Sequence, residues 1–422
     1  MHSVTNAIPT GTIASIPAKA HAHRALICAA LANSPSTILL SRTSKDIDAT
    51  MESLRGLGAH VVYENKVVTI TPGPVPTKGN VVPHESGTTL RLLLPVAASI
   101  CNDVDVDAKG RLPDRPLEPM LSEMKAHGVT FSQDKPPFTM TGRLQGGNFS
   151  MVGDVSSQFF SGLLLAAPQI GLSTITATTP LQSSDYVTLT TETMRDFGVE
   201  VEHTLPDTNI NEAFTVPFGA SFIGRDNYQI EGDWSNAAIW MVAAGMTGKP
   251  ITITGMNKNS VQADRRIIQV MIDAGCDVVW DGMNITVTGR ASKPIHVDLE
   301  QMPDMLPVMA ALACSISGES SFIKGARLRL KESDRLIAVA NLVRDLGGTV
   351  REEGDDLYII GSGILKGGHG DCVNDHRLVM AGTLMALISE NPVTLQDSEA
   401  ITKSYPDFFE DWNLLGGDAH GI

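Results

Sequence analysis

The sequence predicts an α/β protein of two globular domains, each made of three copies of one repeated unit. Its 422 residues exceed what one ordinary hydrophobic core accommodates. Hydrophobic residues make up 42% and aromatic residues 5%, a composition typical of globular α/β proteins and not of disordered chains. Six segments in which a glycine follows an amphipathic helix recur at intervals of about 70 residues, which indicates an internal repeat.

The recurring glycines mark the ends of the amphipathic helices. A helix commonly ends at a residue with positive φ, which glycine adopts without a steric penalty. Short alternating strands follow most of them, as in residues 59–71 and 276–289. The six positions are Gly58, Gly128, Gly198, Gly275, Gly347 and Gly416.

Each unit also contains a helix that is apolar on nearly every side and must therefore be buried. A unit accordingly consists of a polar turn, a buried helix, a strand, an amphipathic helix, the glycine and a further strand. By composition the six units divide as three plus three, and the loop-like segment 217–228 is the best candidate for a crossing between domains. The predicted buried helices are 25–32, 90–100, 159–170, 237–246, 306–316 and 378–388.

Charge and targeting signals restrict the class of protein. The net charge of −15 argues against sequence-independent nucleic-acid binding, although an anionic substrate is compatible with locally convergent basic residues. No stretch is apolar enough to span a membrane, and residues 1–17 lack the features of a secretory or transit peptide, so we expect a cytoplasmic protein. Scattered Cys28, Cys101, Cys276 and Cys314 are expected to be buried, whereas Cys372 lies in a glycine-rich loop and is the one candidate for exposure.

The most informative residues stand where the buried helices begin. A helix N-terminus offers unpaired N–H groups and a positive dipole end, so it attracts anions. An ordinary N-cap explains any single segment, but six together favour sites for phosphate and carboxylate groups. The segments are AKAHAHR (18–24), ESGTTLR (85–91), VSSQF (155–159), GDWSN (232–236), MPDM (302–305) and NDHR (374–377).

Basic residues occur in the same boundary motifs. In KESDR, Lys331 and Arg335 are four residues apart, which predicts that both cations lie on one helical face. Arg91 is a candidate anion ligand, but its side chain could instead simply extend from a buried helix toward solvent. The set comprises Lys19, Arg24, Arg91, Arg115, Lys331, Arg335, Arg377 and Lys403.

The candidates for acid–base chemistry are Asp304, Glu332 and Lys19. Asp304 follows a proline at the start of an apolar helix, where burial would raise its pKa and a nearby cation would lower it. The alternative is that Asp304 only caps this helix. Glu332, between Lys331 and Arg335, is expected to be ionised. His21 and His23 lack a third ligand, and no dinucleotide or nucleotide phosphate loop is present, so neither a metal nor another cofactor is predicted.

In their order these motifs resemble the enolpyruvyl transferase family, and within it the branch that acts on 3-phosphoshikimate. GRLPDRP, PDMLPVMAA and TKSYPDFF contribute to a resemblance that extends from about Ile13 to Leu415. It implies two α/β domains, each of three βαβαββ units in an inside-out barrel, with a substrate cleft between them. The first domain would comprise residues 18–227, and the second residues 1–17 plus 228–422.

The resemblance also implies a reaction. The enolpyruvyl group of phosphoenolpyruvate would move to the 5-hydroxyl of 3-phosphoshikimate by addition and elimination, giving 5-enolpyruvylshikimate-3-phosphate and phosphate in the shikimate pathway to aromatic amino acids. Asp304 would take the hydroxyl proton, while Lys19 and Glu332 would serve the methylene and bridging positions. Implied contacts to 3-phosphoshikimate are Lys19, Arg24, Ser156, Ser157, Gln158, Ser183, Tyr186, Asp304 and Lys331. Implied contacts to phosphoenolpyruvate are Lys19, Gly87, Arg115, Gln158, Arg335, Arg377 and Lys403. Gly87 would leave space for phosphoenolpyruvate and for the herbicide glyphosate, which resembles it.

Three other protein classes are alternatives to this interpretation. The related transferase that acts on UDP-N-acetylglucosamine commonly has a cysteine in the loop aligned with residues 110–116, and an asparagine where Ala20 stands here. RNA 3′-terminal phosphate cyclase has related units but requires a basic surface. A silent phosphoshikimate-binding paralogue is the third alternative, because Ala20 replaces a frequent serine. The partners expected are the two small anions alone, without nucleic acid or membrane, and the chain is expected to be a monomer.

Overall fold

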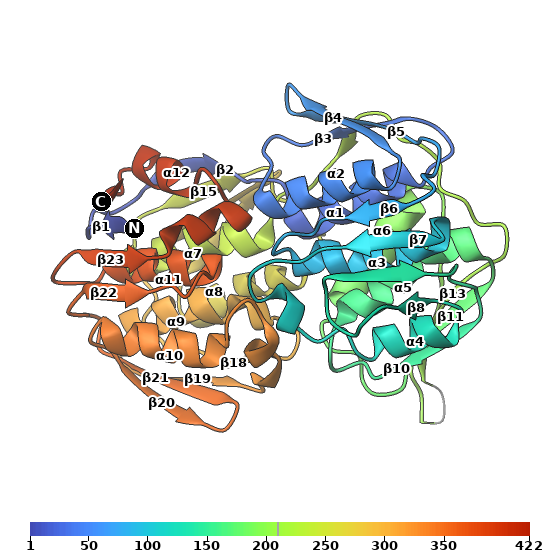
Figure 1. Ribbon diagram of the computed structural model, residues 1–422. Coiled ribbons are helices and arrows are strands. Elements are labelled where there is room, and N and C mark those ends of the chain that lie inside the picture. The colour runs from blue at the N-terminus through green and yellow to red at the C-terminus, as the bar shows by residue number, and fades with distance from the viewer. Residues whose placement is uncertain (209–210) are drawn as a thin grey trace. The chain divides into compact units, whose positions relative to one another are not determined.

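The computed structural model describes residues 1–208 and 211–422, which form two compact units (Figure 1). The central unit comprises residues 17–230, and the terminal unit comprises residues 1–16 and 231–422. The family resemblance implied residues 18–227 for the first domain, and the central unit also includes residues 17 and 228–230. Residues 228–230 stay with the central unit because strand β14 (Tyr228–Gln229) pairs in parallel with β3 (Ser36–Leu39).

Among its described residues, the central unit contains three buried helices, three outer helices and three four-stranded sheets. The buried helices are α1 (Lys19–Ala30), α3 (Gly87–Ile100) and α5 (Ser157–Ile170), and the outer helices are α2 (Lys45–Gly56), α4 (Met120–Ala126) and α6 (Asp185–Asp196). The sheets have the orders β14-β3-β5-β4, β6-β7-β9-β8 and β10-β11-β13-β12. Their remaining strands are β4 (His60–Glu64), β5 (Val67–Thr71), β6 (Gly79–Val81), β7 (Asp103–Val106), β8 (Thr130–Phe131), β9 (Phe138–Thr141), β10 (Asn148–Met151), β11 (Ser173–Ala177), β12 (Glu202–Thr204) and β13 (Glu212–Val216).

The terminal unit repeats this plan. Its buried helices are α7 (Trp234–Thr247), α9 (Leu306–Ser315) and α11 (His376–Ala386), and its outer helices are α8 (Ile267–Asp273), α10 (Arg335–Asp345) and α12 (Phe408–Leu414). Its sheets have the orders β16-β17-β15-β2, β18-β19-β21-β20 and β22-β23-β1-β24. The strands are β1 (His2–Val4), β2 (Gly11–Ala14), β15 (Ile251–Thr254), β16 (Asp277–Asp281), β17 (Asn284–Thr288), β18 (His296–Asp298), β19 (Gly318–Ile323), β20 (Thr349–Glu353), β21 (Asp356–Gly361), β22 (Gly368–Asp371), β23 (Val393–Gln396) and β24 (Ala419–Gly421).

All six sheets share one pairing pattern, which confirms the predicted repeat and fold class. In the second sheet, β6 pairs in parallel with β7, and β7 and β8 both pair antiparallel with β9. Helix α3 connects the parallel strands, and α4 precedes the antiparallel hairpin, so the unit is βαβαββ. A parallel pair requires such a crossover helix, whereas the antiparallel pair is joined by a short turn.

The amphipathic helices end at glycines with positive φ, as predicted. Gly58, Gly128, Gly198, Gly275, Gly347 and Gly416 have φ values of 105°, 98°, 87°, 99°, 87° and 94°. Each follows the last turn of an outer helix, so the conformation that favours glycine occurs at every predicted position.

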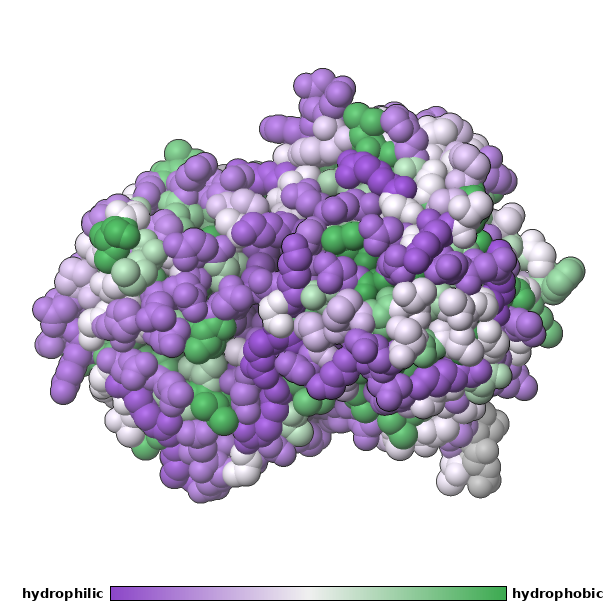
Figure 2. Space-filling model, viewed as in Figure 1, coloured by the Kyte–Doolittle hydropathy of each residue, from purple (hydrophilic) through white to green (hydrophobic). Residues whose placement is uncertain are grey.

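All five cysteines are buried free thiols, which corrects the expectation for Cys372. Its N–H donates to the Gln396 carbonyl, and its side chain packs in the core of the terminal unit. The glycines before it form strand β22, so the segment is not an open loop. On the face shown in Figure 2, hydrophilic residues predominate and apolar residues form small scattered groups. Within the described residues, no helix is both long and apolar enough to cross a bilayer.

Candidate active site

The three buried helices of the central unit run in the same direction. Near their N-termini, Gln158 of α5 donates to Thr88 of α3 (2.9 Å), and Thr89 of α3 donates to the Asp46 carbonyl. The Asp46 carboxylate in turn pairs with Lys19 of α1. Their opposite ends, around residues 30, 100 and 169, line a common pocket. The positive dipole ends therefore gather on one side of the unit.

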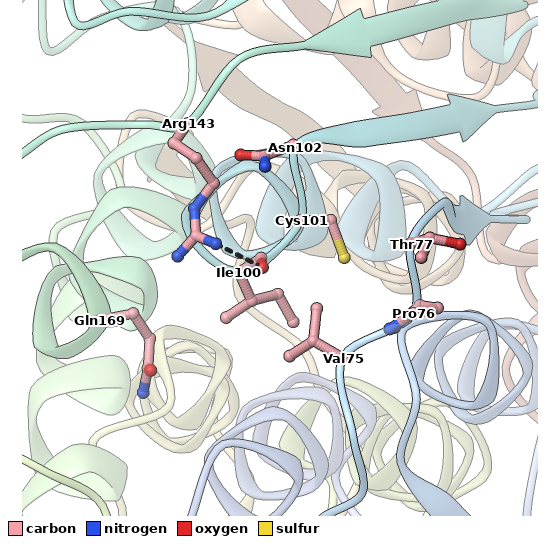
Figure 3. A pocket seen from close by; sticks show the side chains of 8 residues that line it. All are labelled: Val75, Pro76, Thr77, Ile100, Cys101, Asn102, Arg143 and Gln169. Atoms are coloured by element: carbon pink, nitrogen blue, oxygen red, sulfur yellow. Dashed lines mark hydrogen bonds between the residues drawn. The ribbon is translucent and has the colours of Figure 1, made fainter.

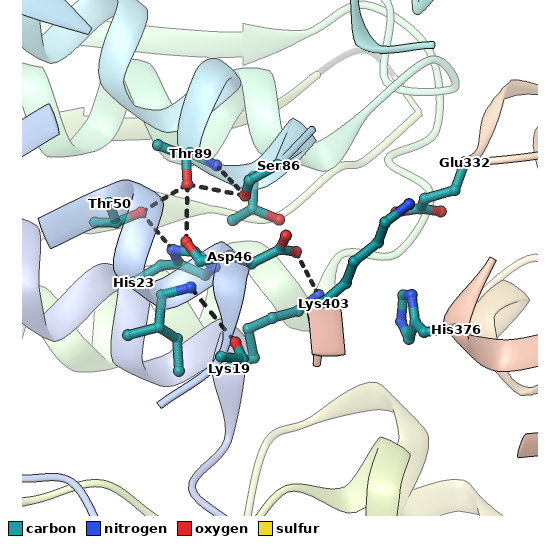
Figure 4. A network of polar contacts seen from close by, with 12 residues as sticks. Lys19, His23, Asp46, Thr50, Ser86, Thr89, Glu332, His376 and Lys403 are labelled. Atoms are coloured by element: carbon teal, nitrogen blue, oxygen red, sulfur yellow. Dashed lines mark hydrogen bonds and ion pairs between the residues drawn. The ribbon is translucent and has the colours of Figure 1, made fainter. Parts of the chain in front are cut away.

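Lys19 is the first residue of α1, and its Nζ lies 2.8 Å from Asp46 Oδ2 (Figure 4). Sequence reasoning missed this partner, although Asp46 follows the Ser44 N-cap of α2. A series of buried hydrogen bonds supports the pair, running from His23 through Thr50 to Thr89 at 2.7 Å each. Because the side chains of Lys19 and Asp46 are only 18% and 11% exposed, their geometry is well constrained.

Arg24 is held entirely inside the central unit. Its guanidinium donates to the Thr190 hydroxyl (2.7 Å) and to the carbonyls of Ala20 (2.7 Å) and Tyr186 (3.0 Å). Burial lowers the pKa of Arg24 to about 10. These contacts join α1 to α6, and the predicted contact of Arg24 with 3-phosphoshikimate stays a prediction.

Arg115 lies against the first turn of α3. A Cβ added at Gly87 would be 2.5 Å from Arg115 Nη1, so the absence of a side chain there leaves room for the guanidinium. Arg91 donates to Gln158 Oε1 (3.1 Å) and to the Pro116 carbonyl (3.1 Å). Arg91 is buried, so its side chain does not extend to solvent. Its hydrogen bonds fix both Gln158 and the loop that carries Arg115.

The predicted serine contacts lie at two separate segments of the central unit. Ser156 caps α5, and its hydroxyl accepts from the Gln158 N–H, while Ser157 begins the helix. Ser183 is buried with φ of 54°, two residues before α6, which carries Tyr186 in its first turn. Positive φ is uncommon for a serine and is often found at functional sites. Their contacts to substrate remain predictions.

In the terminal unit, Asp304 is surrounded by three cations. Its Oδ1 accepts from Arg335 Nη1 (2.6 Å) and lies 3.1 Å from Lys331 Nζ. Its Oδ2 is 3.5 Å from Arg377 Nη2. Asp304 belongs to the short helix η3 (Pro303–Met305) ahead of α9, whereas Arg377 belongs to the first turn of α11. Residues from three segments of the sequence thus meet at one carboxylate.

The prediction that Lys331 and Arg335 share a helical face is wrong. Helix α10 begins only at Arg335, because the Asp334 side chain caps it by accepting from the Ile337 N–H. Lys331 ends the preceding short helix η4 (Ala326–Leu330) in an extended conformation. The two cations nevertheless contact the same oxygen of Asp304, through tertiary folding and not through helical spacing.

Arg335 is the centre of a buried charge network. Besides Asp304, it pairs with Glu332 Oε2 (2.7 Å) and donates to both oxygens of Asp375 (2.7 and 3.1 Å). Asp375 is fully buried; it also accepts from Ser333 and from the Arg377 N–H. Asp375 stands in the predicted NDHR motif but was given no role there. The sequence shows Asp375 only as a polar residue before an apolar helix. That pattern does not reveal Arg335, its partner forty residues away in the chain.

The charges of this network alter its pKa values. Burial alone would raise the pKa of Asp304, but Lys331, Arg377 and Arg335 together hold it well below its usual range. Burial lowers the pKa of Lys331 to about 8, against the opposing effect of Asp304. The opposition of burial and nearby cations expected for Asp304 is therefore confirmed.

Two further residues complete the terminal unit's polar cluster. Lys403 Nζ donates to the Asn374 carbonyl (2.7 Å), which places it just ahead of α11, the helix that carries Arg377. Asp264, which no sequence motif indicated, is buried beside Ser235 at the start of α7. Burial raises the pKa of Asp264 to about 6, with Arg377 opposing and Asp304 adding to the shift.

The cavity shown in Figure 3 lies elsewhere in the central unit. It measures about 330 Å³ and is lined by Val75, Ile100 and Arg143, among others. The Arg143 guanidinium is engaged with the carbonyls of Ile100 (2.8 Å) and Ser99 (2.6 Å). This pocket is at the C-terminal end of α3, about 20 Å along the helix from Gly87, so it is separate from the predicted anion sites.

Fold and side chains together define an α/β protein that gathers cations at the starts of its buried helices and holds an ionised carboxylate among them. Such an arrangement suits the binding of small phosphorylated or carboxylated molecules and proton transfer within them.

Comparison with known proteins identifies the family. The model of the EPSP synthase family (3-phosphoshikimate 1-carboxyvinyltransferase) matches residues 7–412. A 3-phosphoshikimate 1-carboxyvinyltransferase of Clostridium kluyveri is 37% identical over 413 residues, covering 97% of this chain and 95% of its own. The corresponding protein of Methanocorpusculum labreanum is 35% identical over 418 residues, covering 97% of each. The chain belongs to the EPSP synthase family and is a transferase.

The fold agrees with a solved structure. The EPSP synthase of Acinetobacter baumannii superposes with a TM-score of 0.80 at 23% identity, covering 100% of this chain and 99% of its own. The predicted family and its shikimate branch are thus confirmed, and the comparisons favour this interpretation over the UDP-N-acetylglucosamine enzyme and the silent paralogue.

Proposed function

We propose that this chain transfers the enolpyruvyl group of phosphoenolpyruvate to the 5-hydroxyl of 3-phosphoshikimate and releases inorganic phosphate. The observation that carries this proposal is the environment of Asp304, whose carboxylate contacts Lys331, Arg335 and Arg377. A site for two anionic substrates needs convergent cations, and a hydroxyl nucleophile needs a nearby proton acceptor. The cluster around Asp304 supplies both.

In the proposed addition step, the 5-hydroxyl oxygen bonds to the substituted alkene carbon of phosphoenolpyruvate, while a proton is delivered to the methylene carbon. Asp304 accepts the hydroxyl proton. In the elimination step, the bond between the same carbon and the bridging oxygen of the phosphate breaks, which releases phosphate. A proton leaves the methyl group to regenerate the alkene. Lys19 and Glu332 serve the protons at the methylene and bridging positions.

The low pKa of Asp304 bears on its role as a base. Three cations stabilise its anion, which makes the carboxylate a weak proton acceptor before substrates bind. Arg335 and Arg377 are proposed to hold phosphoenolpyruvate, and Lys331 to hold 3-phosphoshikimate. Substrate anions would compensate these positive charges, so the pKa of Asp304 would rise as the site fills.

The central unit supplies the remaining proposed contacts. Gln158 and Arg115 lie near the start of α3, where backbone N–H groups favour an anion such as the carboxylate of phosphoenolpyruvate. Lys19 would contact substrate with its remaining N–H donors while the ion pair with Asp46 holds its ammonium group in place. Ser156, Ser157, Ser183 and Tyr186 are proposed to contact 3-phosphoshikimate, together with Arg24.

The test is to mix purified protein with 3-phosphoshikimate and phosphoenolpyruvate and to follow phosphate release. Asp304→Asn should lower kcat by about 10²–10⁴-fold, since a general base contributes about this much. Asp298→Asn is the matched control, because Asp298 is an exposed acid of the same unit whose carboxylate pairs with surface Lys324 and accepts from the Glu300 N–H. Equal activity of all three proteins would refute the role of Asp304, and no phosphate release by the unaltered protein would refute the proposed function.

Three finer features belong to the same proposal. The chain would act in the cytoplasm on the route to aromatic amino acids, as a monomer that needs no protein partner. Glyphosate would inhibit it by occupying the phosphoenolpyruvate site beside Gly87. Size-exclusion chromatography with light scattering tests the oligomeric state, and an inhibition assay tests the glyphosate site.

A further inference from the structure

A buried carboxyl group lies beside the proposed anion site and takes no part in the reaction described above. Asp264 belongs to the short helix η2 (Ala263–Arg266) and is only 2% exposed. Its Oδ2 accepts a hydrogen bond from the Ser235 hydroxyl, whereas its buried Oδ1 has no hydrogen-bond partner among the described residues. A buried, incompletely paired carboxylate is costly, so its position beside an anion site calls for a physical explanation.

The position of Asp264 is fixed by the segment before it. Gln262 donates to Glu231 Oε1 (2.8 Å) and to the Gly232 carbonyl (2.9 Å), and accepts from the Trp234 N–H (3.1 Å). These contacts attach the turn to the start of α7, where Ser235 meets Asp264. The carboxyl group therefore cannot move readily toward solvent, and its charge must be accommodated where it stands.

Charged groups from three other segments act on Asp264. Arg377 of α11 stabilises its anion, while Asp304 of η3 and Asp233, the N-cap of α7, destabilise it. Its own segment carries Arg265 and Arg266, which donate to the carbonyls of Lys258 and Ala263. Arg377 is thus the cation that most stabilises the Asp264 anion, and it is also a proposed ligand of phosphoenolpyruvate.

We propose that Asp264 takes up a proton from solvent when phosphoenolpyruvate binds beside Arg377, which couples substrate binding to protonation of this carboxyl group. An incoming anion compensates the charge of Arg377 and adds negative charge near Asp264. The carboxylate (–COO⁻) then gains one proton to become –COOH, and the repulsion between it and the substrate disappears. The unpartnered Oδ1 can carry that proton without breaking the hydrogen bond from Ser235. This inference rests on the proposed function, because it assigns Arg377 to phosphoenolpyruvate.

The direct test is calorimetric titration of phosphoenolpyruvate into the protein at pH 7.5 in three buffers with different ionisation enthalpies. The dependence of the observed heat on the buffer gives the number of protons taken up. The unaltered protein should take up more protons than Asp264→Asn, by up to one per bound phosphoenolpyruvate. Asp273→Asn is the matched control, since it removes the same charge from an exposed position on the neighbouring helix α8 and should match the unaltered protein.

A second measurement does not depend on a folded variant. Carbon-13 NMR of the Asp264 carboxyl in the unaltered protein should show an apparent pKa that rises by at least one unit when phosphoenolpyruvate is saturating. Equal proton uptake in Asp264→Asn and the unaltered protein, or an apparent pKa that does not move, would overturn this proposal alone. Absence of binding together with absence of phosphate release in the unaltered protein would overturn the proposed function as well.

Discussion

Arg335 and Asp304 are joined by a 2.6 Å hydrogen bond between the buried guanidinium and a carboxylate that is one-fifth exposed. The same guanidinium contacts Glu332 and both oxygens of Asp375. Arg335 therefore links a residue proposed for proton transfer to a fully buried acid beneath it. Its planar donors suit this task better than a single ammonium group would.

Replacing Arg335 should test how far the terminal unit depends on this network. In Arg335→Met, Asp375 would lose its main counter-ion inside the protein, and breaking a buried pair in this way costs about 3–5 kcal/mol. We expect a loss of that size in the free energy of unfolding, measured by urea denaturation. Arg344→Met is the control: Arg344 pairs with Glu352 at 2.6 Å but is 45% exposed, so its loss should cost about 1 kcal/mol or less. Equal losses in the two variants would contradict the network's structural role.

Loss of the Lys331 proton should make the reaction slower at alkaline pH. Its pKa of about 8 means that the ammonium loses its proton as the pH rises from 7 to 9.5. The kcat/KM for 3-phosphoshikimate, which reports groups of the free enzyme, should fall by about tenfold for each pH unit well above 8. Lys331→Arg keeps its charge throughout this range and should remove most of the fall.

Lys324→Arg is the corresponding control, because Lys324 is an exposed residue of the same unit that pairs with Asp298 and Glu300. Its kcat/KM profile should follow that of the unaltered protein. If Lys331→Arg retained the full alkaline fall, the titrating group would have to be sought elsewhere.

Much of this architecture could be predicted because its causes are local. Positive φ at Gly58 and its five counterparts, and caps such as Ser156 and Asp233, follow from the preferences of single residues at helix ends. Burial of the apolar helices follows from composition alone. These signals also located the segments that carry the proposed site, since the starts of the buried helices coincide with the polar motifs.

The pairings within the site could not be predicted in this way. Lys331 and Arg335 were placed on one helix by spacing, yet the Asp334 cap begins α10 after Lys331. Asp46 and Asp264 each meet their partners through contacts between segments that are distant in sequence. No periodicity reports such contacts, because they depend on how the repeats pack against one another. Most assigned substrate contacts came from family resemblance and remain predictions.

Gly87 offers a test of the proposed phosphoenolpyruvate site. The Cβ of an alanine would lie 2.5 Å from Arg115 Nη1 and 2.9 Å from its Cζ, so the guanidinium would have to shift. Because this is the flexible end of a long side chain, Gly87→Ala should fold normally. We expect it to raise the KM for phosphoenolpyruvate severalfold and to weaken glyphosate inhibition in a phosphate-release assay. Gly421→Ala, with no atom within 4 Å of the added carbon, should change neither value. Unchanged inhibition in Gly87→Ala would place glyphosate elsewhere.

Asp264 should make the folded protein less stable as the pH rises. Its pKa of about 6 in the folded state exceeds the ordinary 3.8, so the folded state binds the proton more tightly than the unfolded state does. The stability associated with this proton is fully present below about pH 4 and is lost as the pH rises through 6. The full difference corresponds to about 3 kcal/mol.

Asp264→Asn should therefore raise the free energy of unfolding at pH 8 by about 1–3 kcal/mol, because it removes a buried anion. At pH 4.5, where the native carboxyl is mostly protonated, the two proteins should unfold at similar urea concentrations. Asp273→Asn should leave stability within about 0.5 kcal/mol at both pH values, since Asp273 is exposed. The gain in the free energy of unfolding of Asp264→Asn over the unaltered protein should be larger at pH 8 than at pH 4.5. An equal gain at the two pH values would show that the Asp264 carboxylate is not costly to bury. The tension between its burial and its charge, on which the coupling to substrate binding depends, would then be absent.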